Sequence, residues 1–407
     1  MRNRRWLVGI ALFGVLSLVA AACGGDDEGG QPAEKIDVTV YGQGAWTGGA
    51  SGLVLPAMQS AQIRFDELNA DATYPATITF ETADTQGSGD QAPPVAQEVA
   101  GNPNTVAVVG PAFSGESRAV GDTYNDNQIP FVTPSATAVD LSEFDWDYWF
   151  RAVGNDGQQG GLAAEYVASV LQPKSLYILH DTTDYGQPLA ETVEAAAKKA
   201  GIKIAGKTGV SEPAIVTGTT VDFSSIISDI EASGADTVFF GGYDVDSGPF
   251  LNQAAAAGLD VQVVSGDGSV STTLLELAGD GAEGTLLIAP SNIFSDFVAK
   301  YTASVGADAF SVAIYAAEGY DVAGIIGEGI RQAIEGGATT PVDIRAGIKT
   351  YLDSLTTGGT FEGESKTYAF DPQTHELSAN PDELYFFYEV QGGELVNLGN
   401  GVEVLGG

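Results

Sequence analysis

Short apolar runs alternate with amphipathic helical patterns along most of this chain, and this alternation restricts the folds it can adopt. The runs are rich in valine, isoleucine, leucine and phenylalanine, and most end at glycine, proline or a small polar residue: 36–41, 76–80, 105–110, 130–133, 175–180, 202–206, 237–241, 261–265 and 284–290. Between them, apolar residues recur at helical spacing, as in the stripe Val54, Met58, Ala61, Phe65 and Leu68. Strands that are apolar throughout and alternate with helices indicate parallel sheets covered on both faces.

The strand and helix units fall into two groups that meet between Arg151 and Gly157. Each group is long enough for a doubly wound sheet of its own, at about 100–200 residues per domain. Residues 290–360 have a mainly helical pattern, so we expect them to pack on one of these lobes. Two apolar stretches flank Gln391-Gly392-Gly393, a pattern typical of a β-hairpin. We therefore predict an α/β fold of two doubly wound lobes, with a ligand cleft at a hinge between the carboxyl ends of their strands.

The chain is expected to cross between the lobes three times, near 151–157, 287–291 and 362–368. These crossings assign 35–152 and 290–363 to the N-terminal lobe, and 153–289 and 364–405 to the C-terminal lobe.

The N-terminus carries the pattern of an export signal. Three arginines among the first five residues precede an apolar stretch, 6–22, which ends in three alanines before Cys23. This ending resembles the lipobox of bacterial lipoproteins, in which the cysteine is lipidated and becomes the mature N-terminus. The lipobox prefers leucine where this chain has Ala20, so the cleavage position is open, and an ordinary secretory signal is the alternative. We expect 1–22 to be a signal peptide, Cys23 the lipidation site and 23–34 a flexible tether to the membrane.

Composition argues against several classes of function. The chain has 54 acidic and 17 basic side chains, a net charge of −37 that repels phosphate backbones, so we predict no nucleic-acid partner. Cys23 is the only cysteine, which excludes an internal disulfide and a thiolate metal site. His180 and His375 are the only histidines, and no nucleophile–base pair is visible. We therefore predict neither a metal, a cofactor nor catalytic residues, and we keep an enzyme only as an alternative.

Hydroxyl side chains follow two neighbouring strands of the first lobe. Ser114 comes after the 105–110 run and opens a helical pattern, where free backbone amides attract an anion. Ser135 and Thr137 follow the 130–133 run. Together the two turns could bind one carboxylate. The alternative is that these residues only cap helices, which serine and threonine favour.

The second lobe offers aromatic and acidic residues at equivalent positions. Tyr185 and Tyr243 each follow a strand and could form the wall of a cleft. Asp267 lies between two glycines at another strand end and could accept an ammonium group, although Asp-Gly also favours plain turns. We interpret His180 as a polar residue at a strand end.

The order of these turns resembles the type I periplasmic binding proteins of branched-chain amino acid ABC transporters, over most of 35–400. The motifs that carry the resemblance are Gly44-Ala45-Trp46-Thr47-Gly48, Gly110–Ser114, Thr133–Thr137, His180–Gly186, Gly241-Gly242-Tyr243, Ser265–Gly268 and Tyr315-Ala316-Ala317. The resemblance implies that the substrate α-carboxylate is held by Ser114, Ser135, Ala136 and Thr137. It implies that Tyr185 and Tyr243 line the cleft, and that Asp267 takes the α-ammonium group.

Some positions depart from the family pattern. Asp267 is one methylene shorter than the glutamate of the leucine-binding members, and the family's first-lobe disulfide cannot form. Leu53 stands where the family often has an aromatic residue, so we expect Trp46 and Phe113 to replace that ring in the substrate pocket.

The resemblance implies an extracytoplasmic solute-binding lipoprotein that captures a small amino acid, branched-chain or otherwise apolar, and delivers it to the membrane subunits of an ABC permease. We expect a monomer that is exported, lipid-anchored and facing the periplasm or cell exterior. The alternatives are a lipoprotein sensor of the same fold, and a binder of an amide, urea-type or aromatic solute.

Overall fold

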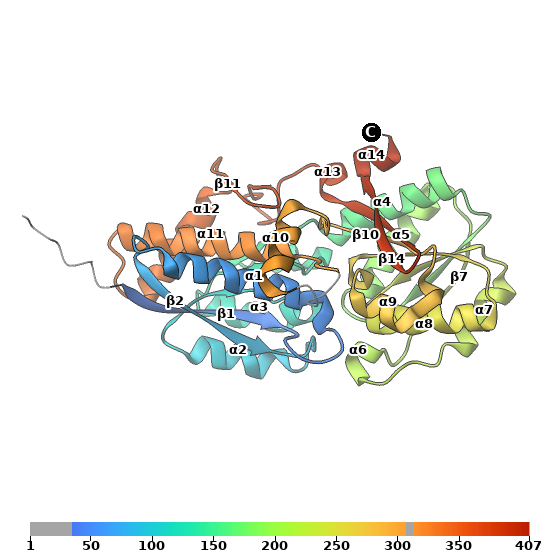
Figure 1. Ribbon diagram of the computed structural model, residues 1–407, viewed down its shortest axis with the longest axis horizontal. Helices are drawn as coiled ribbons and strands as arrows, with labels where there is room; N and C mark the ends of the chain where they lie inside the picture. The colour runs from blue at the N-terminus through green and yellow to red at the C-terminus, as the bar shows by residue number, and fades with distance from the viewer. Residues whose placement is uncertain (1–34, 307–311, 407) are drawn as a thin grey trace, which may run out of the picture. The chain divides into compact units, whose positions relative to one another are not determined.

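The computed structural model describes residues 35–306 and 312–406, which contain two large β-sheets with helices around them and a small antiparallel pair of strands, β11 (Phe361–Glu362) and β12 (Thr367–Tyr368) (Figure 1). The first sheet is wholly parallel, with its strands in the order β2 (Ala76–Asp84), β1 (Ile36–Gly44), β3 (Thr105–Val109), β4 (Phe131–Thr133) and β5 (Trp149–Arg151). All five residues of β3 are buried, whereas burial alternates in part along the edge strand β2. This difference follows from their positions, because a central parallel strand is covered on both faces.

The second sheet is parallel except at one edge. Its order is β14 (Glu394–Asn400), β13 (Phe386–Gln391), β10 (Leu286–Ala289), β9 (Gln262–Ser265), β8 (Thr237–Gly241), β6 (Leu176–His180) and β7 (Ile204–Gly209). Strands β13 and β14 pair antiparallel, with Gln391 opposite Glu394, which confirms the predicted hairpin. Strand β13 also runs antiparallel to β10.

Helices surround each sheet. Those of the first lobe are α1 (Ser51–Ala70), α2 (Ala92–Gly101), α3 (Ser114–Asp126), α11 (Ala316–Glu335) and α12 (Pro341–Ser354), with α10 (Asp296–Val305) beside α11. Those of the second lobe are α4 (Asp156–Tyr166), α5 (Gly186–Lys199), α6 (Ala214–Thr217), α7 (Ser224–Ser233), α8 (Asp244–Ala257), α9 (Thr272–Ala278), α13 (Pro381–Leu384) and α14 (Gly401–Leu405). None of the helices within the described residues combines the length and hydropathy needed to cross a bilayer.

The helical segment after residue 290 packs on the first lobe, because α11 lies along α1 (Figure 1). The two helices approach so closely at Gly319 that a Cβ there would lie 2.1 Å from the carbonyl oxygen of Ala57. Glycine is therefore required at this crossing.

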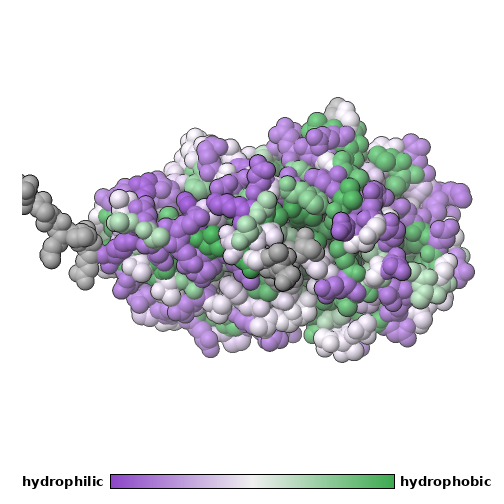
Figure 2. Space-filling view, viewed as in Figure 1, coloured by the Kyte–Doolittle hydropathy of each residue, from purple (hydrophilic) through white to green (hydrophobic). Residues whose placement is uncertain are grey.

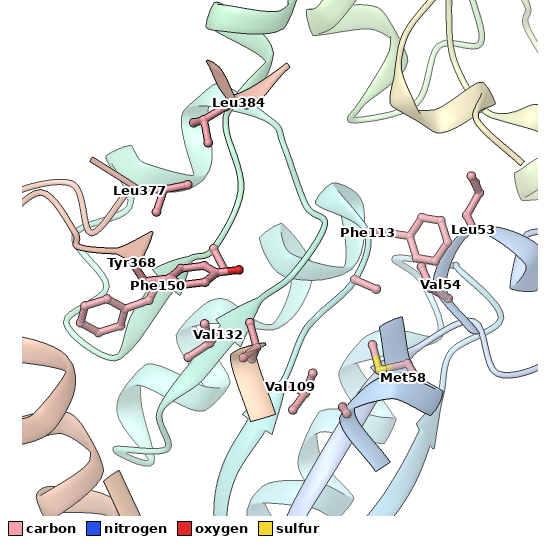
Figure 3. Close-up of a cluster of buried hydrophobic side chains, with 14 of the residues drawn as sticks. Leu53, Val54, Met58, Val109, Phe113, Val132, Phe150, Tyr368, Leu377 and Leu384 are labelled. Carbon is pink, nitrogen blue, oxygen red and sulfur yellow. The ribbon is translucent and has the colours of Figure 1, made fainter. Parts of the chain in front are cut away.

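The buried core of the first lobe includes residues that come late in the chain. Figure 3 shows Phe150 of β5 beside Tyr368 in one continuous apolar cluster. The ring of Phe150 lies edge-on to Phe370, with centroids 5.2 Å apart, and stacks on His375 at 4.3 Å. Arg151 pairs with Glu376 in the same region. The sequence places the third crossing near 362–368; from these contacts we propose that it lies later, between 378 and 381, just before α13.

Hydrophilic side chains cover most of the face shown in Figure 2, and apolar residues form smaller patches between them. The predicted signal peptide, the lipidation site Cys23 and the tether fall in residues 1–34, outside the described residues.

Candidate ligand-binding site

The first-lobe turns lie at the carboxyl ends of β3 and β4, which are neighbours in the sheet. Helix α3 begins at Ser114, so its amide is among those that have no partner inside the helix. The N-cap residue of α3 is Phe113. The N-cap residue of the 3-10 turn that follows Thr137 is Ala138. The alternative that Ser114, Ser135 and Thr137 serve only as helix caps is therefore wrong.

Hydrogen bonds tie these two turns to each other. Ser114 Oγ accepts from the amide of Ala138 at 3.2 Å, and Ser135 Oγ donates to the carbonyl of Ala112 at 2.8 Å. The turn between β4 and the next segment is thus held against the start of α3. This pairing explains why hydroxyl groups from separate strands meet at one place.

The second-lobe residues follow β6, β8 and β9, which are adjacent strands. Tyr185 and Tyr243 immediately precede α5 and α8, and Asp267 opens a short 3-10 turn after β9. The rings of Tyr185 and Tyr243 lie 4.8 Å apart, and Phe113 of the first lobe meets Tyr243 edge-on at 5.4 Å. Aromatic contacts of this kind join the two lobes at the site.

A narrow cavity of about 20 Å³, enough for about one water molecule, lies between these turns, so a larger ligand can enter only when the lobes move apart. Its lining comprises Leu53, Val54, Ala112, Phe113, Ser114, Ser135, Thr137, Tyr185, Tyr243, Asp267, Gly268 and Tyr315. All of these lining residues are buried; Tyr243, for example, is only 7% exposed. Figure 3 shows the apolar part, with Phe113, Leu53 and Val54 gathered at one end of the core cluster. The structure thus brings Ser114, Ser135 and Thr137 together with Tyr185, Tyr243 and Asp267.

Two predicted residues do not line this cavity. The indole nitrogen of Trp46 donates to the carbonyl of Gly42 at 2.7 Å, and its ring packs near Phe80. The amide of Ala136 donates to Thr133 Oγ1 at 2.9 Å, and its side chain is buried in a cluster of the first lobe. Of the two aromatic residues expected to compensate for Leu53, only Phe113 therefore reaches the cavity.

Asp267 is held by three side-chain donors. Its Oδ1 accepts from Gln159 Nε2 at 2.6 Å and from the hydroxyl of Tyr185 at 2.8 Å. Its Oδ2 accepts from the hydroxyl of Tyr315 at 2.6 Å. Tyr315 comes from the segment before α11 of the first lobe, so this last bond connects the lobes directly.

The backbone of Tyr315 is unusual. Its φ is +60°, in the left-handed region that a bulky side chain rarely occupies. Ser291 Oγ accepts from the Tyr315 amide at 3.0 Å and stabilises this conformation. Strained residues held in this way are frequent at binding sites.

Sequence reasoning missed Gln159 and gave Tyr315 no role. Tyr315 belongs to the Tyr315-Ala316-Ala317 motif that the chain shares with the family, so the sequence did contain a pattern that could have identified it as a site residue. Gln159 lies within an ordinary helical pattern, and its contact with Asp267 spans 108 positions of sequence.

Two buried carboxyl groups, those of Asp267 and Asp156, share this region. Burial raises the pKa of Asp267. Burial, and next the charge of Asp267, raises the pKa of Asp156 well above its usual range. Asp156 Oδ2 has no hydrogen-bond partner among the described residues. A cationic group bound to Asp267, which lines the cavity, would stabilise that carboxylate in its charged form, because charges interact strongly where water is excluded.

The cavity therefore offers three kinds of contact. Hydroxyl and amide groups at one end suit a carboxylate, Asp267 at the other suits an ammonium group, and Leu53 and Phe113 suit an apolar side chain. No group of three histidine, cysteine or acidic residues is placed to hold a metal within 35–306 and 312–406.

Comparisons with known proteins identify the family of the chain. The sequence model of the family described as periplasmic binding protein matches residues 44–394. The Leu/Ile/Val-binding protein of Citrobacter freundii is 34% identical over 202 residues, which are 50% of this chain and 53% of that protein, so the chain spans about half of this relative. A Leu/Ile/Val-binding protein of Rhizobium johnstonii is 30% identical over 345 residues, covering 83% of this chain and 92% of that protein.

The same fold is found among solved structures. The branched-chain amino acid transporter substrate binding protein of Streptococcus pneumoniae, in complex with isoleucine, has a TM-score of 0.73 and 22% identity, covering 89% of this chain and 100% of that one. Sequence and fold thus agree, and the chain belongs to the type I periplasmic binding proteins, among the relatives of the Leu/Ile/Val-binding proteins.

Proposed function

We propose that this chain is an extracytoplasmic solute-binding protein that captures a small apolar amino acid between its lobes and delivers it to an ABC permease. The observation that carries the proposal is the single cavity in which Ser114 and Thr137 of one lobe face Asp267 of the other. A zwitterion placed there has a partner for each charge.

Binding is expected to begin on the first lobe. The Ser114 and Thr137 turns take the carboxylate, and hinge closure then brings up Tyr185, Tyr243 and Asp267. Closure excludes water, which strengthens the charge-assisted hydrogen bonds at both ends of the ligand. Hinge closure converts occupancy of the site into a shape that a permease can recognise.

The membrane attachment is part of the proposal. Lipidation of Cys23 would anchor the protein to the membrane, facing the periplasm or cell exterior, and 24–34 would act as the tether. We expect a monomer. The second candidate is a sensor of the same fold, which would bind the same solute and signal to a membrane partner.

Calorimetric titration of residues 35–407, which form one compact unit, tests the ligand class. The panel comprises leucine, isoleucine, valine, alanine, glutamate, urea and benzoate. We expect micromolar or tighter binding of at least one apolar amino acid, and weak binding of glutamate because of the acidic surface and Asp267. Binding of urea or benzoate without any amino acid would refute the proposal.

A further inference from the structure

Both polar atoms of the Gln159 side chain form hydrogen bonds at the second-lobe end of the cavity. It is 1% exposed and comes from α4, the first helix after the chain leaves the first lobe. Its Nε2 donates to Asp267 Oδ1 at 2.6 Å and to Asp156 Oδ1 at 3.0 Å. Its Oε1 accepts from the backbone amide of Asp267 at 3.0 Å. Gln159 therefore contacts both the backbone and the carboxylate of Asp267.

This pattern determines which way the Gln159 amide points. With Oε1 on the Asp267 amide, only Nε2 can face the two carboxylates, because a flipped amide would set donor against donor. Asp156 supports the arrangement from the other side. Its backbone amide donates to the carbonyl of Thr137 at 2.8 Å, so Gln159 is indirectly attached to the carboxylate-binding turn of the first lobe.

The remaining hydrogen-bond capacity of Asp267 lies on one atom. A carboxylate offers about four lone-pair positions, two on each oxygen. Gln159 and Tyr185 occupy both positions of Oδ1, whereas Tyr315 occupies one position of Oδ2. An ammonium group would therefore bond to Oδ2.

We propose that Gln159 is a positioning residue that holds the Asp267 carboxylate with Oδ2 free for the ammonium group of a bound amino acid. Gln159 thereby sets the preference of the site for amino acids over the same acids without the amino group. This inference rests on the proposed function, since it presupposes an amino-acid ligand.

The test compares leucine with 4-methylpentanoate, which is leucine without its amino group. Gln159→Met keeps the length of the side chain and removes its donors and acceptor. We expect the affinity for leucine to fall by about 10-fold or more, as for loss of a hydrogen bond to a charged group, and the affinity for 4-methylpentanoate to change less than about 3-fold. Both dissociation constants are measured by calorimetry on the purified full chain.

Two further variants separate positioning from general structural damage. Gln43→Met removes another fully buried glutamine, whose side chain bonds to Tyr124 instead, and should lower the thermal midpoint without changing the ratio of the two affinities. Asp156→Asn keeps an oxygen for Gln159 Nε2 and removes the charge, so the ratio should stay within about 3-fold of the wild-type value.

Each outcome has one meaning. An unchanged ratio in Gln159→Met, with leucine still bound by the wild-type chain, overturns the inference and leaves the proposed function standing. An equal loss of both affinities assigns Gln159 a merely structural role and also overturns it. A collapse of the ratio in Asp156→Asn would show that the Asp156 charge, and not positioning by Gln159, creates the preference. Failure of the wild-type chain to bind any apolar amino acid overturns the proposed function and the inference together.

Discussion

The buried carboxyl group of Glu116 should make the stability of this protein fall as the pH rises. Glu116 lies in the first turn of α3 and is fully buried. Thr85 Oγ1 donates to its Oε1, and its Oε2 has no hydrogen-bond partner among the described residues. Burial raises its pKa from 4.5 to about 8. The folded state therefore retains a proton that the unfolded state releases.

The size of the effect follows from proton linkage. Below about pH 4.5 both states bind the proton and Glu116 costs nothing; the cost then grows until the folded state also releases the proton near pH 8. Each pH unit in this window corresponds to about 1.4 kcal/mol, so the free energy of unfolding falls by about 3 kcal/mol between about pH 4.5 and about pH 7. Glu116→Gln imitates the protonated group at every pH and should remove this loss.

Urea denaturation of both proteins at several pH values measures the difference. The stability advantage of Glu116→Gln should be small near pH 4.5 and grow by about 3 kcal/mol toward pH 7. Subtracting the pH profile of wild-type stability from that of the variant cancels the contributions of the other buried acids. Glu98→Gln, an exposed position on α2, is the matched control and should show no such growth. A difference independent of pH, or a variant less stable than wild type at pH 7, would refute the reasoning.

Three other predictions concern the site and the packing. Asp267→Ala should weaken leucine binding at least 100-fold in calorimetry, as expected when one partner of a buried charge pair is truncated. The thermal midpoint of the ligand-free protein should change little. Unaltered affinity for leucine would show that Asp267 is not part of the site. Asp184→Asn breaks the 2.7 Å ion pair with Arg118 that joins the lobes, and should weaken ligand binding by less than about 5-fold, with a smaller effect in high salt; an effect that salt leaves unchanged would contradict this. Gly319→Ala forces a methyl group against a backbone carbonyl of α1 and should lower the free energy of unfolding by about 1–3 kcal/mol in thermal denaturation. Gly161→Ala places its methyl group in open space and should leave the free energy of unfolding unchanged. Equal thermal midpoints for the two variants would show that α1 and α11 can separate.

Much of the fold is readable from the sequence because buried parallel strands are continuous apolar runs. Strand β5 was not predicted, since its three residues, Trp149–Arg151, are too short to form a pattern. The position of the third crossing depends on ring contacts such as Phe150–Phe370 between distant segments, which no local pattern records.

The candidate site was readable only in part, for a similar reason. Ser114, Thr137 and Asp267 stand directly after strands, and the carboxyl ends of neighbouring parallel strands converge. Residues that reach the cavity from elsewhere carry no such signal: Gln159 acts from a helix face. Trp46 has the expected residue type, but a hydrogen bond to its own turn holds it outside the cavity lining.

The return of α11 and α12 to the first lobe has a consequence for biogenesis. An exported chain emerges from its N-terminus, and the face of α1 that contacts α11 stays uncovered until residues 316–335 follow. Contacts this distant in sequence form slowly, because a long loop must close first. For a chain exported as proposed, we therefore expect the N-terminal half to complete its folding only after α11 has emerged.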